Sequence, residues 1–384
     1  MPLVKMLAGA AAALSAVLAL SAPSSGQAPP ASPVMAHYRA YTSALAAGDL
    51  PAAENAAAAA LVASEARDGD GGRTAVFALN LATVRLMRGS HAEALAPARR
   101  ARALADNPAT GVHPQLADLI VGRIALALNE PNAPDQLATA LRQVAPGGPA
   151  PTDEISAAAV ALGTWASTNQ NYTLAREAWA IAAAFPEGTG AEATYARANA
   201  HIQLGASIFK QEVGPRGREM IDREAAAEAH RAFHQAKLAL APLAEVELAG
   251  GQMTFAQRAY AEAITWDAVL RGKAGRRFPR EPGEAEGDAD GITELGPVAG
   301  SDSRPRCLVG MRKVTGLHYP EEAVEKNQIG AVGVRFRLNE GGEAEEAQVV
   351  VNLGSPVFAE AVGDVRRWRF ERRPDSPAKT VEWR

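Results

Sequence analysis

The sequence predicts a multi-domain chain: an all-α array of helical hairpins followed by a small α+β domain. Alanine and leucine dominate residues 34–273, where apolar residues recur three and four positions apart, as on one face of a helix. Residues 331–338, "AVGVRFRL", instead alternate apolar and polar side chains, which is typical of a half-buried strand. Residues 274–306 are rich in glycine, proline and charge, and this composition predicts a flexible linker between the two parts.

The composition sets limits on the class of protein. A chain of 384 residues is long enough for two or three domains, and a hydrophobic content of 47% excludes global disorder. The 39 basic and 43 acidic residues give a formal net charge of -4. Because nucleic-acid binding requires a clustered basic surface, no nucleic-acid partner is expected.

The N-terminus has the pattern of an export signal, which we place at residues 1–28. Lys5 precedes an apolar run, Met6–Ala22, that ends in small residues suited to cleavage. Cleavage would leave the mature protein outside the cytoplasm, in a periplasm. A second interpretation stays open, in which the run is an uncleaved inner-membrane anchor, although it falls short of the ~20 residues that span a bilayer.

Turn signals divide the helical region at regular intervals. They fall at Gly48, Gly89, Asn129 and Asn169, a spacing of about forty residues that points to stacked helical hairpins. A single hairpin cannot cover its own apolar face, so neighbouring hairpins must stack. Small residues at 82, 94 and 101 fall where two helices of such a stack would cross closely.

This region resembles tetratricopeptide repeats. The resemblance is clearest from Asn80 to Leu104. The residues that carry it are Asn80-Leu81-Ala82, Gly89 and Glu93-Ala94-Leu95.

Residues 307–384 predict three antiparallel strands with two helices on one face. Pro320 begins a short helix to Asn327, and "NEGG" joins the strand at 331–338 to a return strand that places Ala347, Val349 and Val351 on one face. A second helix follows from position 355, and "WRF" begins the last strand, which is interrupted by "ERRPDSP". Two helices on one face would hide the apolar side of such a sheet.

The segment from Arg312 to Trp383 resembles the TonB C-terminal domain family. The spacing of a Tyr-Pro pair, a Gly-x-Val-x-Val-x-Phe strand and a Trp-x-Phe element carries the resemblance. The matching residues are Tyr319-Pro320, Ala323, Gly330, Val332, Val334, Phe336, Gly342, Val349, Phe358, Ala361, Val365 and Trp368-Arg369-Phe370.

The resemblance implies a non-enzymatic domain that lies in the periplasm and takes up an extended peptide from an outer-membrane transporter. The peptide would pair with an open sheet edge by strand addition. By position, the residues expected at that edge are Gly316, Leu317, His318, Tyr319, Thr380, Val381, Glu382 and Trp383.

Three functional hypotheses follow. The first is an exported periplasmic protein-binding and scaffold protein, in which a repeat array is tethered to a strand-adding domain, with no catalytic residue, cofactor or metal. The second is a TonB-type energy transducer for outer-membrane transport, with an uncleaved N-terminal anchor; the sequence lacks the long Pro-Lys/Pro-Glu spacer of such proteins.

The third hypothesis is a metal-dependent hydrolase. His230 and His234 stand four apart on a predicted helix, which is the spacing of two metal ligands, and Glu224 and Glu228 lie on the same helix. Arg231 occupies the position at which a zinc protease of the HExxH type has glutamate.

Overall fold

The structure of the protein is a computed structural model. It describes residues 32–71, 73–144, 151–185, 190–213, 221–244, 253–274, 294–295, 309–313, 321–322, 331–339, 341–353, 356–372 and 382–383. They form two compact units: residues to Gln170 with Ala184–Glu187, and Asn171–Ala183 with Gly188–Arg384. Among the described helices, none is both long enough and apolar enough to cross a membrane. The predicted signal peptide lies outside the described residues, and the predicted domain boundaries stay predictions.

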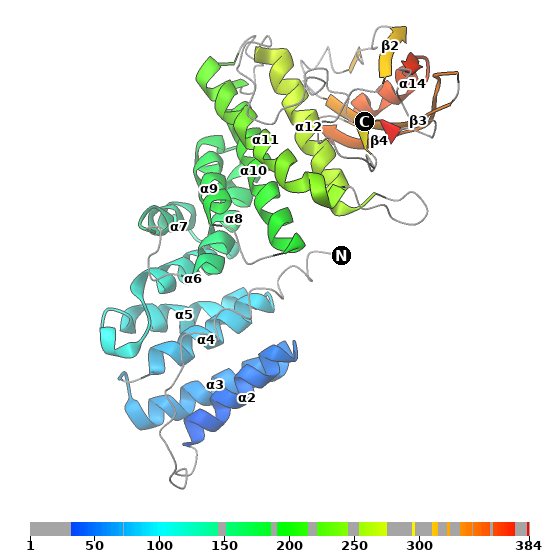
Figure 1. The fold of residues 1–384 in the computed structure, drawn as a ribbon. Helices are drawn as coiled ribbons and strands as arrows, with labels where there is room; N and C mark the ends of the chain where they lie inside the picture. Colours follow the sequence, from blue (N-terminus) through cyan, green and yellow to red (C-terminus); the bar gives the residue numbers. More distant parts are fainter. Residues whose placement is uncertain are drawn as a thin grey trace. The chain divides into compact units, whose positions relative to one another are not determined.

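The first unit consists of helical hairpins (Figure 1). Its elements are α2 (Pro33–Ala46), α3 (Leu50–Asp68), α4 (Thr74–Met87), α5 (His91–Leu104), the 3-10 helix η3 (Pro108–Thr110), α6 (Pro114–Ala127), α7 (Ala133–Arg142) and α8 (Thr152–Thr168). Helices pack in the pairs α2–α3, α4–α5 and α6–α7, and successive pairs stack through α3–α4 and α5–α6. Helices α2, α4, α6 and α8 begin at residues 33, 74, 114 and 152, so the predicted period of about forty is confirmed.

The hairpin turns form where the sequence predicts them. Gly48, Gly89 and Asn129 have φ angles of 71°, 76° and 54°, the left-handed conformation that ends many helices. In each turn the amide of the next residue donates to the carbonyl five positions earlier, at 2.9, 2.8 and 2.9 Å. At the fourth turn the left-handed residue is Gln170, next to the predicted Asn169.

Small side chains allow the helices of the second hairpin to approach closely. Ala82, Ala94 and Ala101 are all fully buried, as their spacing predicts. They belong to one core cluster with Leu79 and Ile120, which extends from the second hairpin onto α6. The apolar face of one hairpin is therefore covered by the next hairpin, as a repeat array requires.

The second unit joins four helices to the C-terminal strands. Its helices are α9 (Tyr172–Ala184), α10 (Ala191–Val213), α11 (Arg223–Ala244) and α12 (Phe255–Ala274). The elements that follow are β1 (Glu294–Leu295), β2 (Val309–Lys313), β3 (Ala331–Leu338), β4 (Ala344–Leu353), the 3-10 helix η6 (Pro356–Ala361), α14 (Val362–Val365), β5 (Arg369–Arg372) and β6 (Glu382–Trp383). Of the predicted helix at 320–327, Glu321 and Glu322 are helical, and the other residues lie outside the described residues.

The strands form a four-stranded antiparallel sheet in the order β1-β6-β3-β4 and a separate antiparallel pair, β2-β5. This confirms the predicted fold class, a helical-hairpin array followed by a small antiparallel sheet. The single last strand expected from "WRF" onward is instead two strands: β5 pairs with β2, and β6 pairs with β3. Pro374 and Pro377 lie between β5 and β6 in the sequence, and a proline cannot donate a ladder hydrogen bond, so this composition opposes one continuous strand.

One face of the main sheet carries the core of the C-terminal domain. Val334 and Phe336 of β3 pack with Val365 of α14 and Phe370 of β5. The rings of Phe336 and Phe370 lie 5.0 Å apart between centroids, and Trp368 packs at the edge of the cluster. Trp368 and Phe370, which the family pattern contains, therefore serve the packing of the domain.

The opposite face of the sheet packs against α12. Gly333 lies opposite Val351 of β4, and a Cβ on Gly333 would be 3.0 Å from the Thr265 hydroxyl oxygen. The prediction that Val351 shares a face with Ala347 is wrong, because the β3–β4 register shifts between them: Gly333 lies opposite Val351, but the next residue, Val334, lies opposite Val349. A second shift lies before Ala347, near Glu346, whose φ is 50°. A bulge adds one unpaired residue and reverses the face on which later side chains lie.

Candidate peptide-docking edge of the C-terminal sheet

Two of the predicted edge residues lie in the main sheet. Glu382 and Trp383 form β6, and on one side they pair with Arg337 and Phe336 of β3. The other predicted edge residues lie outside the described residues; they are Gly316, Leu317, His318, Tyr319, Thr380 and Val381. The structure therefore places Glu382 and Trp383, the last two residues of the predicted site, beside β3.

The outer side of β6 pairs with a second short strand from a distant part of the chain. Glu294 of β1 lies opposite Trp383, and Leu295 lies opposite Glu382, in antiparallel register. Sequence reasoning missed β1, because its two residues lie within the predicted linker at 274–306 and carry no periodic signal. The outer side of β6 thus accommodates an extended antiparallel segment.

Within the part of the sheet that the structure describes, most of β3 has a strand on one side only. Along its length β3 pairs with β4, whereas the described part of β6 reaches only Phe336 and Arg337. Within the described sheet, Ala331–Arg335 therefore pairs with β4 alone. These residues continue the β6 side of the sheet and offer further main-chain groups for pairing.

The other edge of the sheet, β4, has features that oppose strand addition. The bulge at Glu346 bends the strand, and the neighbouring Glu345 is exposed. Arg366 donates to the Ala347 carbonyl at 3.2 Å and so occupies a main-chain acceptor of this strand. Bulges and charged side chains are common protections of natural sheet edges. The side of the sheet formed by β6 and β3 is therefore the stronger candidate for docking.

The pair β2–β5 was also missed by sequence reasoning. Val309–Lys313 pairs with Arg369–Arg372, with an irregularity between Met311 and Lys313. Val309 and Met311 alternate with Gly310 and Arg312, so a weak strand pattern exists in "VGMRK". Its partner lies about sixty residues away in the sequence, a distance over which a local pattern carries no information on pairing.

The histidine pair proposed as metal ligands lies in the helical core. His230 and His234 are 1% and 3% exposed. His230 Nδ1 lies 2.6 Å from Asp267 Oδ1, and Lys237 Nζ lies 3.1 Å from Asp267 Oδ2. Glu228, a proposed third ligand, forms an ion pair with Arg176.

The described residues contain no group of three or more histidine, cysteine or acidic side chains arranged to hold a metal ion. The cluster of His230, Lys237 and Asp267 instead joins α11 to α12. This geometry gives the hydrolase hypothesis no support.

A second set of polar groups is enclosed between the helices of the same unit. Lys210 Nζ lies 5.5 Å from the ring centroid of Trp266 and 5.8 Å from that of Tyr172, as in cation–π pairs. Burial lowers the pKa of the Lys210 ammonium, which the charge of Glu262 partly opposes. Burial likewise raises the pKa of the Glu262 carboxyl. These groups lie in the packing between helices α9, α10 and α12.

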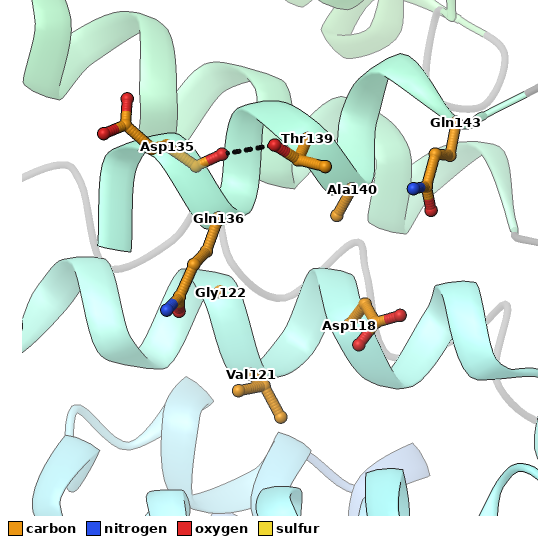
Figure 2. Close-up of a pocket in the computed structure, with 8 residues that line it drawn as sticks. All are labelled: Asp118, Val121, Gly122, Asp135, Gln136, Thr139, Ala140 and Gln143. Atoms are coloured by element: carbon orange, nitrogen blue, oxygen red, sulfur yellow. Dashed lines mark hydrogen bonds between the residues drawn. The ribbon is translucent and has the colours of Figure 1, made fainter. Parts of the chain in front are cut away.

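In the first unit, a groove of about 410 Å³ lies between α6 and α7 (Figure 2). Gly122 brings the two helices together, because a Cβ there would be 2.8 Å from Leu137 Cδ1. Several of the lining groups already have partners: Asp118 accepts from Arg102 Nε at 2.5 Å, and the Thr139 hydroxyl donates to a main-chain carbonyl of α7 at 2.8 Å. The groove contains none of the residues predicted for docking.

Comparison with known proteins supports the interpretation of the C-terminal domain. A search of curated proteins gave no match to the chain. A family model matches residues 315–383, and this match supports a protein-interacting role for the C-terminal domain and a place in a Gram-negative envelope. The matched segment contains β3, β4, β5 and β6, the strands that build the candidate edge. Residues 315–383 of the chain match the family of the Gram-negative bacterial TonB protein C-terminal.

Proposed function

We propose that the protein is an exported periplasmic binding and scaffold protein whose C-terminal domain takes up an extended partner segment by strand addition. One observation carries the proposal: β1 pairs with the outer side of β6 in antiparallel register, which is the arrangement that a partner strand would adopt. A partner strand at this position would exchange main-chain hydrogen bonds with the outer side of β6. No catalytic step is part of this function.

The helical array is the second component of the proposal. Stacked hairpins give repeat proteins an extended surface for proteins or peptides. Two binding regions in one chain raise the local concentration of the second for a partner held at the first, typically into the millimolar range. A weak strand pairing at the C-terminal domain would then suffice for stable capture.

Energy transduction is the alternative that the family match favours. In this function the apolar run at Met6–Ala22 would remain in the inner membrane, and the C-terminal domain would pull on an outer-membrane transporter. The two functions share the docking edge and differ in the state of the N-terminus.

The mature N-terminus distinguishes these two functions. We expect mass spectrometry of the protein from envelope fractions to find a start between Ala22 and Ala31, because signal peptidase cleaves after the small residues that end the apolar run. An intact Met1 in the membrane fraction would instead establish the anchor and favour energy transduction.

Removing Lys379–Arg384 is expected to abolish crosslinking capture of the partner from an envelope fraction. The truncation deletes β6, so both β3 and the partner lose a strand at the docking edge. The helical array is expected to keep its circular dichroism signal at 222 nm per mole of protein. Capture would be measured with the full-length chain and the truncated chain at equal concentration.

Two double variants serve as matched controls for the truncation. Glu382→Pro with Trp383→Pro removes two amide donors, whereas Glu382→Ala with Trp383→Ala retains them. If main-chain pairing holds the partner, the alanine pair captures it and the proline pair does not. Equal capture by the truncated, proline and full-length chains would refute the docking edge.

A further inference from the structure

The strand β1 and a docked partner would need the same main-chain groups. A strand has two hydrogen-bonding sides, and the inner side of β6 is used by Phe336 and Arg337 of β3. The outer side is used by β1, with Glu294 opposite Trp383. A partner that pairs with these two residues of β6 must therefore replace β1.

We propose that the segment around Glu294–Leu295 is an internal competitor for the docking edge. It pairs with β6 when the partner is absent and leaves β6 when the partner strand arrives. This inference rests on the proposed function and adds to it a form of self-inhibition. It also defines the orientation of the partner, which should run antiparallel to β6, as β1 does.

The short length of β1 suits a strand that a partner strand has to displace from β6. Within the described residues, β1 pairs with β6 at two positions, and short two-stranded pairings are marginally stable in water. Pro297 stands two positions after Leu295 in the sequence, and proline cannot donate a ladder hydrogen bond, which limits extension of β1 in that direction. A partner strand that pairs with more residues of the β6 segment than β1 does would replace β1 readily.

The covalent connection makes such a short strand an effective competitor. Nineteen residues separate the last residue of α12, Ala274, from Glu294. A connection of this length between two sites gives a local concentration on the order of millimolar. A partner must compete with that concentration, and its apparent dissociation constant rises by the inverse of the fraction of molecules in which the edge is open.

The first test uses two variants of the full-length chain that differ only in the main chain of β1. Glu294→Pro with Leu295→Pro removes the amide donors of β1, and Glu294→Ala with Leu295→Ala keeps them. Hydrogen–deuterium exchange is then measured at the amides of Glu382 and Trp383. We expect exchange about three- to ten-fold faster in the proline variant than in the alanine variant, because β6 loses its outer neighbour. Equal exchange in the two variants would overturn the proposal.

The second test adds a competing strand in trans. The probe is a synthetic peptide with the sequence of residues 290–298, "DGITELGPV", titrated into each full-length variant and followed by NMR line shifts. The proline variant should bind the peptide about three- to ten-fold more tightly than the alanine variant, because its edge is open. Equal affinity in the two variants, or no binding to the proline variant, would overturn the proposal.

Envelope capture separates failure of this inference from failure of the proposed function. If removal of Lys379–Arg384 leaves capture unchanged, the docking edge itself is refuted. If the truncation abolishes capture but the proline and alanine variants of β1 capture equally well, the edge stands and the competitor is refuted.

Discussion

Replacing Asp267 by asparagine is expected to lower the free energy of unfolding of the second unit by about 3–5 kcal/mol. Asp267 is 3% exposed, and its two carboxylate oxygens lie 2.6 Å from His230 Nδ1 and 3.1 Å from Lys237 Nζ. Asparagine keeps the size of the side chain but removes the carboxylate that faces the buried Lys237 ammonium. Urea unfolding followed by circular dichroism, with hydrogen exchange across α11 and α12, would measure the loss.

Two further variants control this prediction. Asp68→Asn breaks an exposed ion pair with Arg67, and we expect a much smaller change in the urea midpoint. Adding Lys237→Met to Asp267→Asn should restore part of the lost stability, because it removes the buried cation that faced the Asp267 carboxylate. Equal shifts of the midpoint by Asp267→Asn and Asp68→Asn would show that the buried cluster stabilises the protein no more than an exposed ion pair does.

Replacing Gly342 by alanine is expected to destabilise the C-terminal domain by about 3 kcal/mol or more. Gly342 has a φ of 75°, and a Cβ at this position would overlap the main-chain carbonyl oxygen of Phe370. Its own carbonyl accepts a hydrogen bond from the Phe370 amide at 2.9 Å. A side chain here would push β5 away from the β3–β4 turn, and because both contacts are with main chain, the neighbours cannot adjust by a rotamer change.

The adjacent glycine offers a matched control. A Cβ on Gly341 would come no closer than 3.3 Å to the Asn339 side chain, so Gly341→Ala is expected to fold nearly as well as the parent. Hydrogen exchange of β3, β4 and β5 in the full-length chain would compare the two variants. Equal protection in both variants would contradict the tight approach of Phe370 to this turn.

The features of the fold that were predicted from the sequence are those set by local interactions. The left-handed turns at Gly48, Gly89 and Asn129 and the alternation in β3 depend on residues that are neighbours in the chain. The β3–β4 hairpin was also predictable, since a short glycine-containing turn brings its strands together.

The features that the sequence could not predict depend on pairs that are distant in the chain. The spacing of His230 and His234 was visible, but their environment is set by α12, which supplies Asp267 thirty-seven positions after His230. The pairing of β1 with β6 joins segments nearly ninety residues apart and involves two residues in each strand. Strands this short have no period to detect. The reversal of Val351 to the α12 side of the sheet required the bulges themselves, which no residue pattern in β4 signals.

The Asp267 cluster and the Gly342 turn both support the sheet in which β1 and a partner strand would compete for β6. The Asp267 cluster holds α12 to α11, and α12 packs on one face of the sheet. The Gly342 turn holds β5 to the β3–β4 hairpin, whose strand β3 is the inner neighbour of β6. Loss of either support is therefore expected to weaken partner capture indirectly, whereas the proline substitutions in β1 should strengthen it.

Crosslink mapping in the captured complex tests the docking edge most directly. The full-length chain would be crosslinked to its partner in an envelope fraction, and mass spectrometry would identify the residues of the chain that are joined to the partner. The account predicts crosslinks at residues 316–319 and 380–383, joined to a short extended segment of the partner that runs antiparallel to β6. Crosslinks confined to the helices, with none at these residues, would contradict it.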